Sequence, residues 1–185
     1  MMQALVDNAG RYRRGGVGVF SESGCVHIAP PAERVPYLMS DLFDWLNHSH
    51  DHLLVRSCVF HYEFEFIHPF ADGNGRMGRL WQSLILSKLH PIFEHLPVEN
   101  MVYANQQQYY DAITASNNAA NSSAFIDFML GEILKTLETH KKDYKPTVPN
   151  KVPNKVPNKV PNKLLQAFPE IQDMAWRIYL LLVAD

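Results

Sequence analysis

The chain has 185 residues, of which 46% are hydrophobic, enough for one well-formed core. Its formal net charge of −2 gives no overall attraction to nucleic acid, and its two cysteines are too few for a disulfide scaffold. No segment resembles a signal peptide or an apolar membrane span, so we expect a cytoplasmic protein without a membrane partner.

The first predicted element is a short β-hairpin over residues 17–30. Residues 17–20 and 26–28 are rich in β-branched side chains, and residues 21–24 between them are typical of a turn. A hairpin of this kind exposes a strand edge, to which a peptide can add its backbone as a further strand. The same pattern also fits a surface hairpin without a function.

Three predicted helices follow the hairpin. Apolar residues recur at helical spacing over residues 35–46 and again over residues 55–67, where they form an apolar face. Pro69 disfavours continuation of the second helix past His68. The apolar pattern resumes after a short loop, so the third helix should begin near Asn74 or Gly75.

Alternate histidines occur between the first two predicted helices, at His48, His50 and His52. They would bind a transition metal only if this segment were extended and other ligands converged on it. We therefore interpret the segment as a polar loop between helices.

The loop before the third helix carries residues suited to binding the phosphates of a nucleotide. Gly73, Asn74 and Gly75 lie at the start of a helix, where unpaired backbone N–H groups bind anions and small residues allow close approach. Arg76 and Arg79 are three residues apart on one helical face and can reach the same anion. Asp72 is suited to a Mg²⁺ ion that also binds phosphate, and His68 to accepting a proton from a hydroxyl.

Each of these residues also has an ordinary structural explanation. A histidine at a helix end often caps or packs, an Asp-Gly pair is often only a turn, and arginines on a helix often form a solvated face. We interpret Phe70 as a core anchor that pins the loop. The combination at this spacing favours the phosphate-binding interpretation.

Residues 68–79, HPFADGNGRMGR, resemble the Fic motif, H-x-F-x-[D/E]-G-N-G-R-x-x-R, at every specified position. The resemblance covers about residues 10–140, and the predicted hairpin is similar to the flap of that family. It implies a mainly α fold, a helical bundle with a small β-hairpin flap over the active site. The Fic catalytic domain would span residues 1–145.

The resemblance implies that the chain is a protein adenylyltransferase, a nucleotidyltransferase that moves AMP from ATP to a Ser, Thr or Tyr hydroxyl of a protein and releases pyrophosphate. By position, His68 would be the catalytic base and Asp72 the ligand of Mg²⁺ or Mn²⁺. Gly73, Asn74 and Gly75 would hold the α- and β-phosphates, and Arg76 and Arg79 the outer phosphates. The target protein, or a second copy during self-modification, would dock on the flap at Gly18, Val19, Val26 and His27.

The same resemblance places the nucleobase against Tyr109, Tyr110, Ile113 and Asn117. Three of them, Tyr109, Ile113 and Asn117, are spaced four residues apart, which independently puts them on one face of a helix. Packing of the two tyrosines into the core is the alternative interpretation.

Many Fic proteins carry an inhibitory helix with the pattern [S/T]-x-x-x-E-[G/N]. No Ser or Thr in this sequence has a Glu four residues later, so we expect a shortened chain that lacks an internal inhibitory helix. Such a chain should modify itself with AMP in vitro. Two alternatives stay open. The domain could be a non-catalytic, nucleotide-responsive regulatory or interaction module, or it could remove AMP from a modified protein.

The C-terminal part begins with four copies of Val-Pro-Asn-Lys over residues 148–163. Proline in every unit excludes a helix and favours an extended linker, which we place at residues 146–163. Residues 164–185 are predicted to form a helical segment, similar to the start of a winged-helix region. The recognition helix and wing are missing from it, so DNA binding is not supported.

Overall fold

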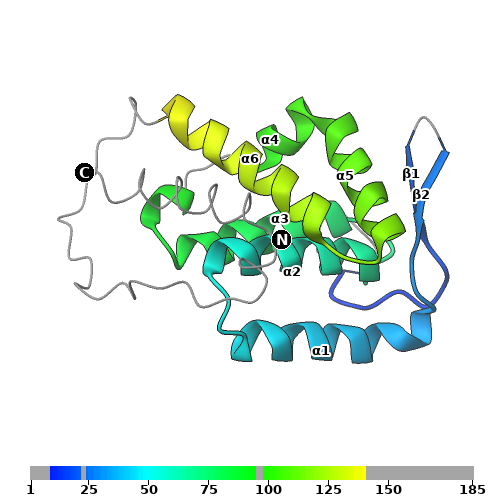
Figure 1. Ribbon diagram of the computed structural model, residues 1–185. Helices are drawn as coiled ribbons and strands as arrows, with labels where there is room; N and C mark the ends of the chain where they lie inside the picture. Colours follow the sequence, from blue (N-terminus) through cyan, green and yellow to red (C-terminus); the bar gives the residue numbers. More distant parts are fainter. Residues whose placement is uncertain (1–8, 22–23, 95–97, 141–185) are drawn as a thin grey trace.

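The computed structural model describes residues 9–21, 24–94 and 98–140 (Figure 1). The predicted linker, residues 146–163, and the predicted C-terminal helical segment, residues 164–185, lie outside the described residues. The described chain is mainly helical, with one two-stranded sheet. This confirms the expected fold class.

The hairpin consists of β1 (Gly18–Ser21) and β2 (Gly24–Ile28), paired antiparallel. Gly18 pairs with Ile28 and Val19 with His27, and the register shifts between Val19 and Phe20. The hairpin stands at one edge of the molecule beside helix α5 (Gln106–Ala119) (Figure 1).

The helices form three layers (Figure 1). Helix α1 (Val35–His48), preceded by the 3₁₀ turn η1 (Ala32–Arg34), lies below α2 (Leu53–Ile67) and α3 (Asn74–Ser87). Above them lie α4 (Val98–Ala104), α5 and α6 (Ser123–His140), and the 3₁₀ turn η2 (Pro91–Glu94) follows α3. The three helices predicted before residue 90 are therefore present, and α3 begins at Asn74 as expected.

Helix α2 is the central helix of the fold. The sequence predicted one apolar face for it, whereas the structure buries residues on all of its sides. It packs against α1, α3 and α6, so residues on every side of it are buried. The first core cluster joins α2 to α4, α5 and α6 and includes Leu54, Val55, Cys58, Tyr62, Tyr109, Phe125 and Met129. The second core cluster joins α2 to α1 and α3 and includes Val35, Met39, Leu42, Phe60, Phe64, Ile67 and Ile85.

The histidine-rich segment has a structural use in the loop between α1 and α2. His48 is the last residue of α1, and His52 is the N-cap of α2, where its Nδ1 accepts a hydrogen bond from Leu54 N. In the part of the chain that the structure describes, no group of three or more His, Cys, Asp or Glu side chains is arranged to hold a metal ion. Nor is any described helix both long and apolar enough to cross a membrane.

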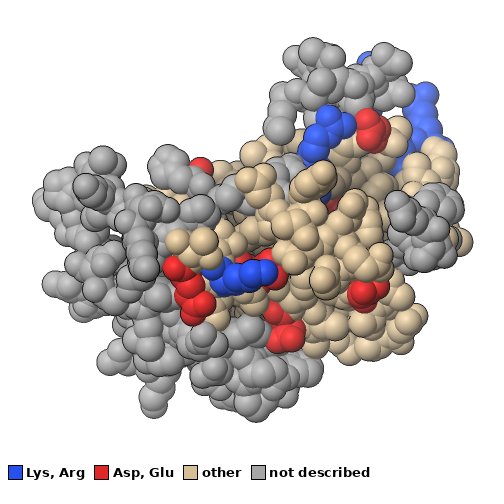
Figure 2. Space-filling model, turned by 90° about the horizontal axis from the view of Figure 1, so that it is seen from above, with Lys and Arg blue, Asp and Glu red and all other residues tan. Residues whose placement is uncertain are grey.

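Figure 2 shows the face of the molecule above α4, α5 and α6. Among the described residues on this face, lysine and arginine side chains are few and lie scattered among acidic and uncharged ones. The described part of this face therefore offers no broad basic surface of the kind that nucleic-acid binding requires.

Candidate active site

His68 lies at the junction between α2 and the loop that leads to α3. It is the C-cap of α2 and adopts the left-handed conformation, with φ 50° and ψ 62°. A non-glycine residue in this region costs about 1–3 kcal/mol and persists only where the surrounding structure enforces it. The turn directs the chain away from α2, and the imidazole lies beside two cavities.

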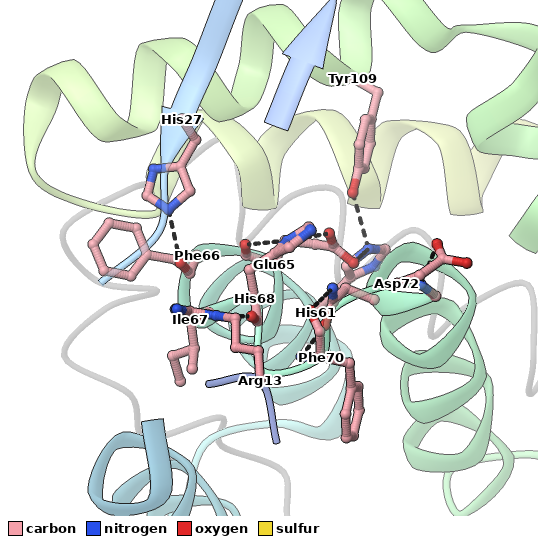
Figure 3. A network of polar contacts seen from close by, with 12 residues as sticks. Arg13, His27, His61, Glu65, Phe66, Ile67, His68, Phe70, Asp72 and Tyr109 are labelled. Atoms are coloured by element: carbon pink, nitrogen blue, oxygen red, sulfur yellow. Dashed lines mark hydrogen bonds and ion pairs between the residues drawn. The ribbon is translucent and has the colours of Figure 1, made fainter. Parts of the chain in front are cut away.

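The protonation of the imidazole follows from its contacts (Figure 3). The Nδ1 atom of His68 lies 3.2 Å from the carbonyl oxygen of Glu65, which can only accept a hydrogen bond. Nδ1 therefore carries the proton, and Nε2 keeps an unprotonated lone pair. Burial lowers the pKa of His68 below 6.5, and the nearby His27 and Arg13 lower it further against the opposing hydrogen bond to Glu65. The side chain is thus neutral at pH 7, as a general base must be.

The loop after His68 is held by the side chain of Asn74. Its Oδ1 accepts a hydrogen bond from Phe70 N at 2.8 Å, and its Nδ2 donates to Phe70 O at 2.8 Å. The Phe70 ring packs near Phe64 and Tyr12 and joins the second core cluster. The almost fully buried side chain of Asn74 thereby braces the loop, and its backbone N–H lies at the start of α3.

The N-terminus of α3 is open toward the larger cavity. The first hydrogen bond of the helix runs from Met77 N to Gly73 O, so the N–H groups of Asn74, Gly75 and Arg76 have no intrahelical partner. The N-cap, Gly73, has φ 85°, which favours glycine, and no side chain caps the helix. This arrangement leaves three N–H groups and the positive end of the helix dipole free to bind phosphate oxygens.

Asp72 lies at this helix end. Its Oδ1 accepts a hydrogen bond from Gly73 N at 2.6 Å, and its Oδ2 lies 3.3 Å from Nη2 of Arg76. The carboxylate is exposed, so it is available to an ion that takes its other ligands from phosphates and water. The donor set fits Mg²⁺ or Mn²⁺ held jointly with a nucleotide, and does not form a complete metal site by itself.

Arg79 lies one turn further along α3 and lines both cavities. A Cβ atom added at Gly75 would lie 3.0 Å from Nη1 of Arg79, so the guanidinium lies directly against the backbone of the anion-binding turn. Arg76 and Arg79 both face the larger cavity, which has a volume of about 500 Å³, within the usual range of small-molecule sites.

The smaller cavity adjoins the larger one and has largely apolar walls. It is lined by Tyr109, Tyr110, Ile113 and Asn117 of α5 and shares His68, Gly75, Arg79, Tyr109 and Tyr110 with the larger cavity. Tyr109 is both a core residue and a cavity wall, so the two interpretations of this tyrosine are compatible. A largely apolar cavity beside an anion-binding helix end suits the base of a nucleotide.

Buried polar contacts fix the walls of the smaller cavity. Gln82 Oε1 lies 2.6 Å from His61 Nδ1 and accepts a hydrogen bond from it. His61 Nε2 therefore carries no proton and accepts a hydrogen bond from the Tyr109 hydroxyl at 3.2 Å (Figure 3). Burial lowers the pKa of His61 to about 4, so this histidine is neutral. The Tyr62 hydroxyl donates to Asn117 Oδ1 at 2.7 Å, which leaves the Asn117 amide NH₂ as a donor.

Three of the four predicted flap residues line the cavities. Gly18 lines the larger cavity, and Val19 and His27 line the smaller one. The His27 ring stacks near Phe66, and its Nε2 donates to Phe66 O at 2.7 Å. Val26 belongs to β2.

The structure brings most of the predicted site residues together around His68. Those lining the two cavities are Gly18, Val19, His27, His68, Asp72, Gly73, Asn74, Gly75, Arg76, Arg79, Tyr109, Tyr110, Ile113 and Asn117. Phe70 lies outside the cavities, against the core. The prediction that Gly73, Asn74 and Gly75 act alike needs refinement, because the Asn74 side chain braces the loop.

Glu65 is a site residue that the sequence interpretation missed. It lies one turn before His68 in an apolar helix, and this polar position was the available signal. Its carboxyl is buried 3.8 Å from His68 Nδ1 and 4.0 Å from His61 Nε2, and its Oε1 has no hydrogen-bond partner. Burial raises the pKa of Glu65 to about 7, against the opposing charge of Arg79. Because His61 is neutral, its contact with Glu65 is not an ion pair.

Residues 1–86 match the sequence model of the Fic/DOC family. This part of the chain is similar to Fic/DOC family domains. Its fold is similar to a crystal structure of a Fic family protein from Desulfovibrio desulfuricans G20, with a TM-score of 0.72 and 42% identity over 97% of this chain and 55% of the other.

Curated relatives include a probable protein adenylyltransferase of Aquifex aeolicus, 32% identical over 110 residues, or 59% of this chain. A protein adenylyltransferase Fic of Nematostella vectensis is 28% identical over 135 residues, or 71% of this chain. The matches cover 31% and 29% of those two proteins, so the chain spans about a third of the length of these Fic relatives.

Proposed function

We propose that residues 68–79 are the catalytic motif of this Fic domain and that the chain is a protein adenylyltransferase. It transfers AMP from ATP to a Ser, Thr or Tyr hydroxyl of a protein and releases pyrophosphate. The main support is the place of His68, whose neutral imidazole with an unprotonated Nε2 lies where the two cavities meet. The names of the relatives, protein adenylyltransferases, support the same reaction.

The reaction follows from the two cavities. The nucleobase occupies the smaller cavity, where the Asn117 amide offers a donor, and the phosphates lie at the open end of α3. The target hydroxyl oxygen attacks the α-phosphorus, its proton moves to His68 Nε2, and the bond from the α-phosphorus to the bridging oxygen breaks. Pyrophosphate leaves with that oxygen, and the charge that develops on it is balanced by Arg76, Arg79 and the helix N-terminus.

The proposal includes a divalent cation that binds together with ATP. Asp72 is the residue that would hold Mg²⁺ or Mn²⁺, and the ion would neutralise phosphate charge. Arg76 Nη2 lies 3.3 Å from Asp72 Oδ2, so in this proposal the same carboxylate is shared between the arginine and the ion.

The target protein docks on the flap in this proposal. Among the described residues the sheet has two strands, and a two-stranded sheet has edges to which a further strand can add. The hairpin borders the larger cavity through Gly18 and the smaller one through Val19 and His27. Self-modification is the simplest case. Residues 1–145 would form the catalytic domain, with the repeat as a linker to the C-terminal segment.

The experiment that tests the reaction uses ATP labelled at either the α- or the γ-phosphate, with Mg²⁺ or Mn²⁺. Adenylyl transfer attaches the α-label to protein and leaves the γ-label in pyrophosphate, and intact mass rises by one AMP. His68→Ala should abolish transfer while ATP binding, followed by calorimetry, remains. Attachment of the γ-label would replace the proposal with phosphoryl transfer. ATP binding without any transfer would favour the non-catalytic alternative.

A further inference from the structure

The end of α2 carries an unusual series of capped carbonyl groups. At the C-terminus of a helix the last carbonyls lack intrahelical partners and need other donors. Here consecutive carbonyls from Glu65 to Pro69 each receive a hydrogen bond from a group outside the regular helix pattern. His68 Nδ1 donates to Glu65 O, His27 Nε2 to Phe66 O, and the remaining three are bound by Arg13.

Arg13 binds three successive carbonyl groups of the turn that contains His68 (Figure 3). Its Nη2 donates to Ile67 O at 3.2 Å, its Nε to His68 O at 2.7 Å, and its main-chain N to Pro69 O at 2.9 Å. The residue is only 6% exposed, although it follows the exposed Arg11 and precedes the exposed Arg14. A planar guanidinium can satisfy several carbonyls at fixed angles, and lysine cannot reproduce this geometry.

The same guanidinium also holds the base of the flap. Its Nη1 donates to Gly15 O at 2.9 Å and its Nη2 to Pro30 O at 2.5 Å. Gly15 precedes β1 and Pro30 follows β2, so Arg13 connects both ends of the hairpin to the turn that contains His68. Arg13 itself lines neither of the two cavities, so it is not placed to bind the nucleotide.

We propose that Arg13 is a positioning residue of the reaction: it holds His68 in its left-handed turn and fixes the flap relative to the histidine. This inference rests on the proposed adenylyl transfer. The reaction needs His68 Nε2 and a flap-bound hydroxyl to be aligned at one phosphorus atom. Arg13 binds both the turn that contains His68 and the base of the flap, so it sets the position of the histidine relative to a hydroxyl bound on the flap. Small errors in such an alignment reduce reaction rates strongly.

The test compares Arg13→Ala and Arg13→Lys with Arg14→Ala, which removes the same charge from the exposed neighbour. Arg13→Ala should lower kcat roughly 10- to 100-fold while KM for ATP changes little, because the nucleotide contacts remain. Arg13→Lys keeps the charge but should recover only part of this loss. Added guanidinium ion should partly restore kcat of Arg13→Ala and leave the wild type and Arg14→Ala unchanged.

A second readout does not depend on activity. The charged or titratable groups facing His68 are Arg13, His27 on β2 and Glu65 on α2, with Arg79 of α3 across the shared cavities. NMR of the His68 imidazole should show loss of the Nδ1-protonated tautomer in Arg13→Ala, and Arg14→Ala should match the wild type. Arg13→Lys, which keeps the charge, gives the same comparison if Arg13→Ala does not fold.

Three results would overturn the inference. The first is a kcat of Arg13→Lys equal to that of the wild type, and the second is an unchanged tautomer of His68 in both Arg13 variants. The third is an equal loss of kcat and ATP affinity without guanidinium rescue, because that pattern indicates general unfolding and not a lost alignment. If the wild type itself transfers no AMP, the proposed function fails, while the tautomer measurement still decides whether Arg13 holds His68.

Discussion

The strained backbone of His68 and its neutral imidazole are two results of one arrangement. The turn places the residue past the end of α2, and the Glu65 carbonyl then fixes the proton on Nδ1. A glycine would adopt this conformation without strain but would carry no base. The left-handed histidine is therefore most simply understood as a functional constraint.

The pH dependence of the reaction should report this environment. Burial lowers the pKa of His68, so its basic form persists to lower pH than that of an exposed histidine. We expect kcat/KM for adenylyl transfer to fall on the acid side with a midpoint below 6.5. The profile should be measured in the wild type and in Glu65→Gln, because Glu65 has a pKa of about 7 and titrates nearby. A midpoint at or above 6.5 in Glu65→Gln would contradict the assignment.

Glu65 should make stability depend on pH with an uncommon sign. Its pKa rises from 4.5 in the unfolded chain to about 7 in the folded one, so the folded state binds the proton more tightly. The free energy of unfolding should therefore fall as pH rises from about 4.5 to about 7. Above pH 7 the full cost applies, and Glu65→Gln should then be more stable than the wild type by about 1–3 kcal/mol.

Urea unfolding at pH 5 and pH 8.5 measures this effect of Glu65. Glu94→Gln changes an exposed glutamate in η2 and is the matched control. A difference between wild type and Glu65→Gln that is equal at both pH values would show that the carboxyl does not titrate as proposed.

Single residues were predicted from the sequence where chemistry and spacing coincide. Asp72, Arg76 and Arg79 lie within a short segment, and the structure places them around one helix end. Arg13 carried no such signal, because Arg11 and Arg14 beside it are arginines too. Only the fold distinguishes them, since it buries Arg13 and leaves the other two exposed. Contacts between residues more than fifty positions apart, such as Arg13 with His68, are not encoded in local pattern.

At the scale of elements, α3 packs against α2 at Gly78. A Cβ atom added there would lie 2.7 Å from Glu65 Oε1 and 3.3 Å from His61 Cδ2. Glycine inside a helix normally costs about 1 kcal/mol relative to alanine. The fold accepts this cost because a larger residue would push the buried Glu65 carboxyl away from its place beside His68.

Gly78→Ala should consequently destabilise the protein by about 1–3 kcal/mol instead of stabilising it. Urea unfolding measures the change, and Glu65→Ala supplies the test of its cause. With the carboxyl gone, only the milder contact with His61 Cδ2 at 3.3 Å remains, so Gly78→Ala should cost clearly less in the Glu65→Ala background. An equal penalty in both backgrounds would show that the Glu65 carboxyl is not the obstacle.

The elements themselves were largely predictable because their signals are local. The Pro69 break, the glycines at the start of α3 and the apolar spacing set the limits of α2 and α3 within a few residues. The central place of α2 was not predictable to the same extent. Apolar residues on every side of α2 are typical of a buried helix, but the pattern does not show which distant helices cover each side.

At the scale of the whole molecule, α2 belongs to both core clusters. Leu54 and Val55 lie in the first, and Phe60 and Phe64 lie in the second. The active site lies at the C-terminal end of this shared helix. Because α2 is shared, a substitution that destabilises one cluster should also destabilise the other cluster and the candidate active site.

A matched pair of methionines tests this coupling between the two core clusters. Met129 of α6 lies in the first and Met39 of α1 in the second, and both are almost fully buried. Each Met→Ala change should cost about 2–5 kcal/mol and keep a single unfolding transition. In a Trp176→Phe background, fluorescence reports Trp45 and Trp81, which pack against the second cluster, and far-UV circular dichroism reports all helices. Coincident transitions are expected even for Met129→Ala, because α2 cannot leave one cluster without the other. If fluorescence of Met129→Ala instead kept the wild-type midpoint while circular dichroism lost amplitude earlier, the two clusters would unfold independently.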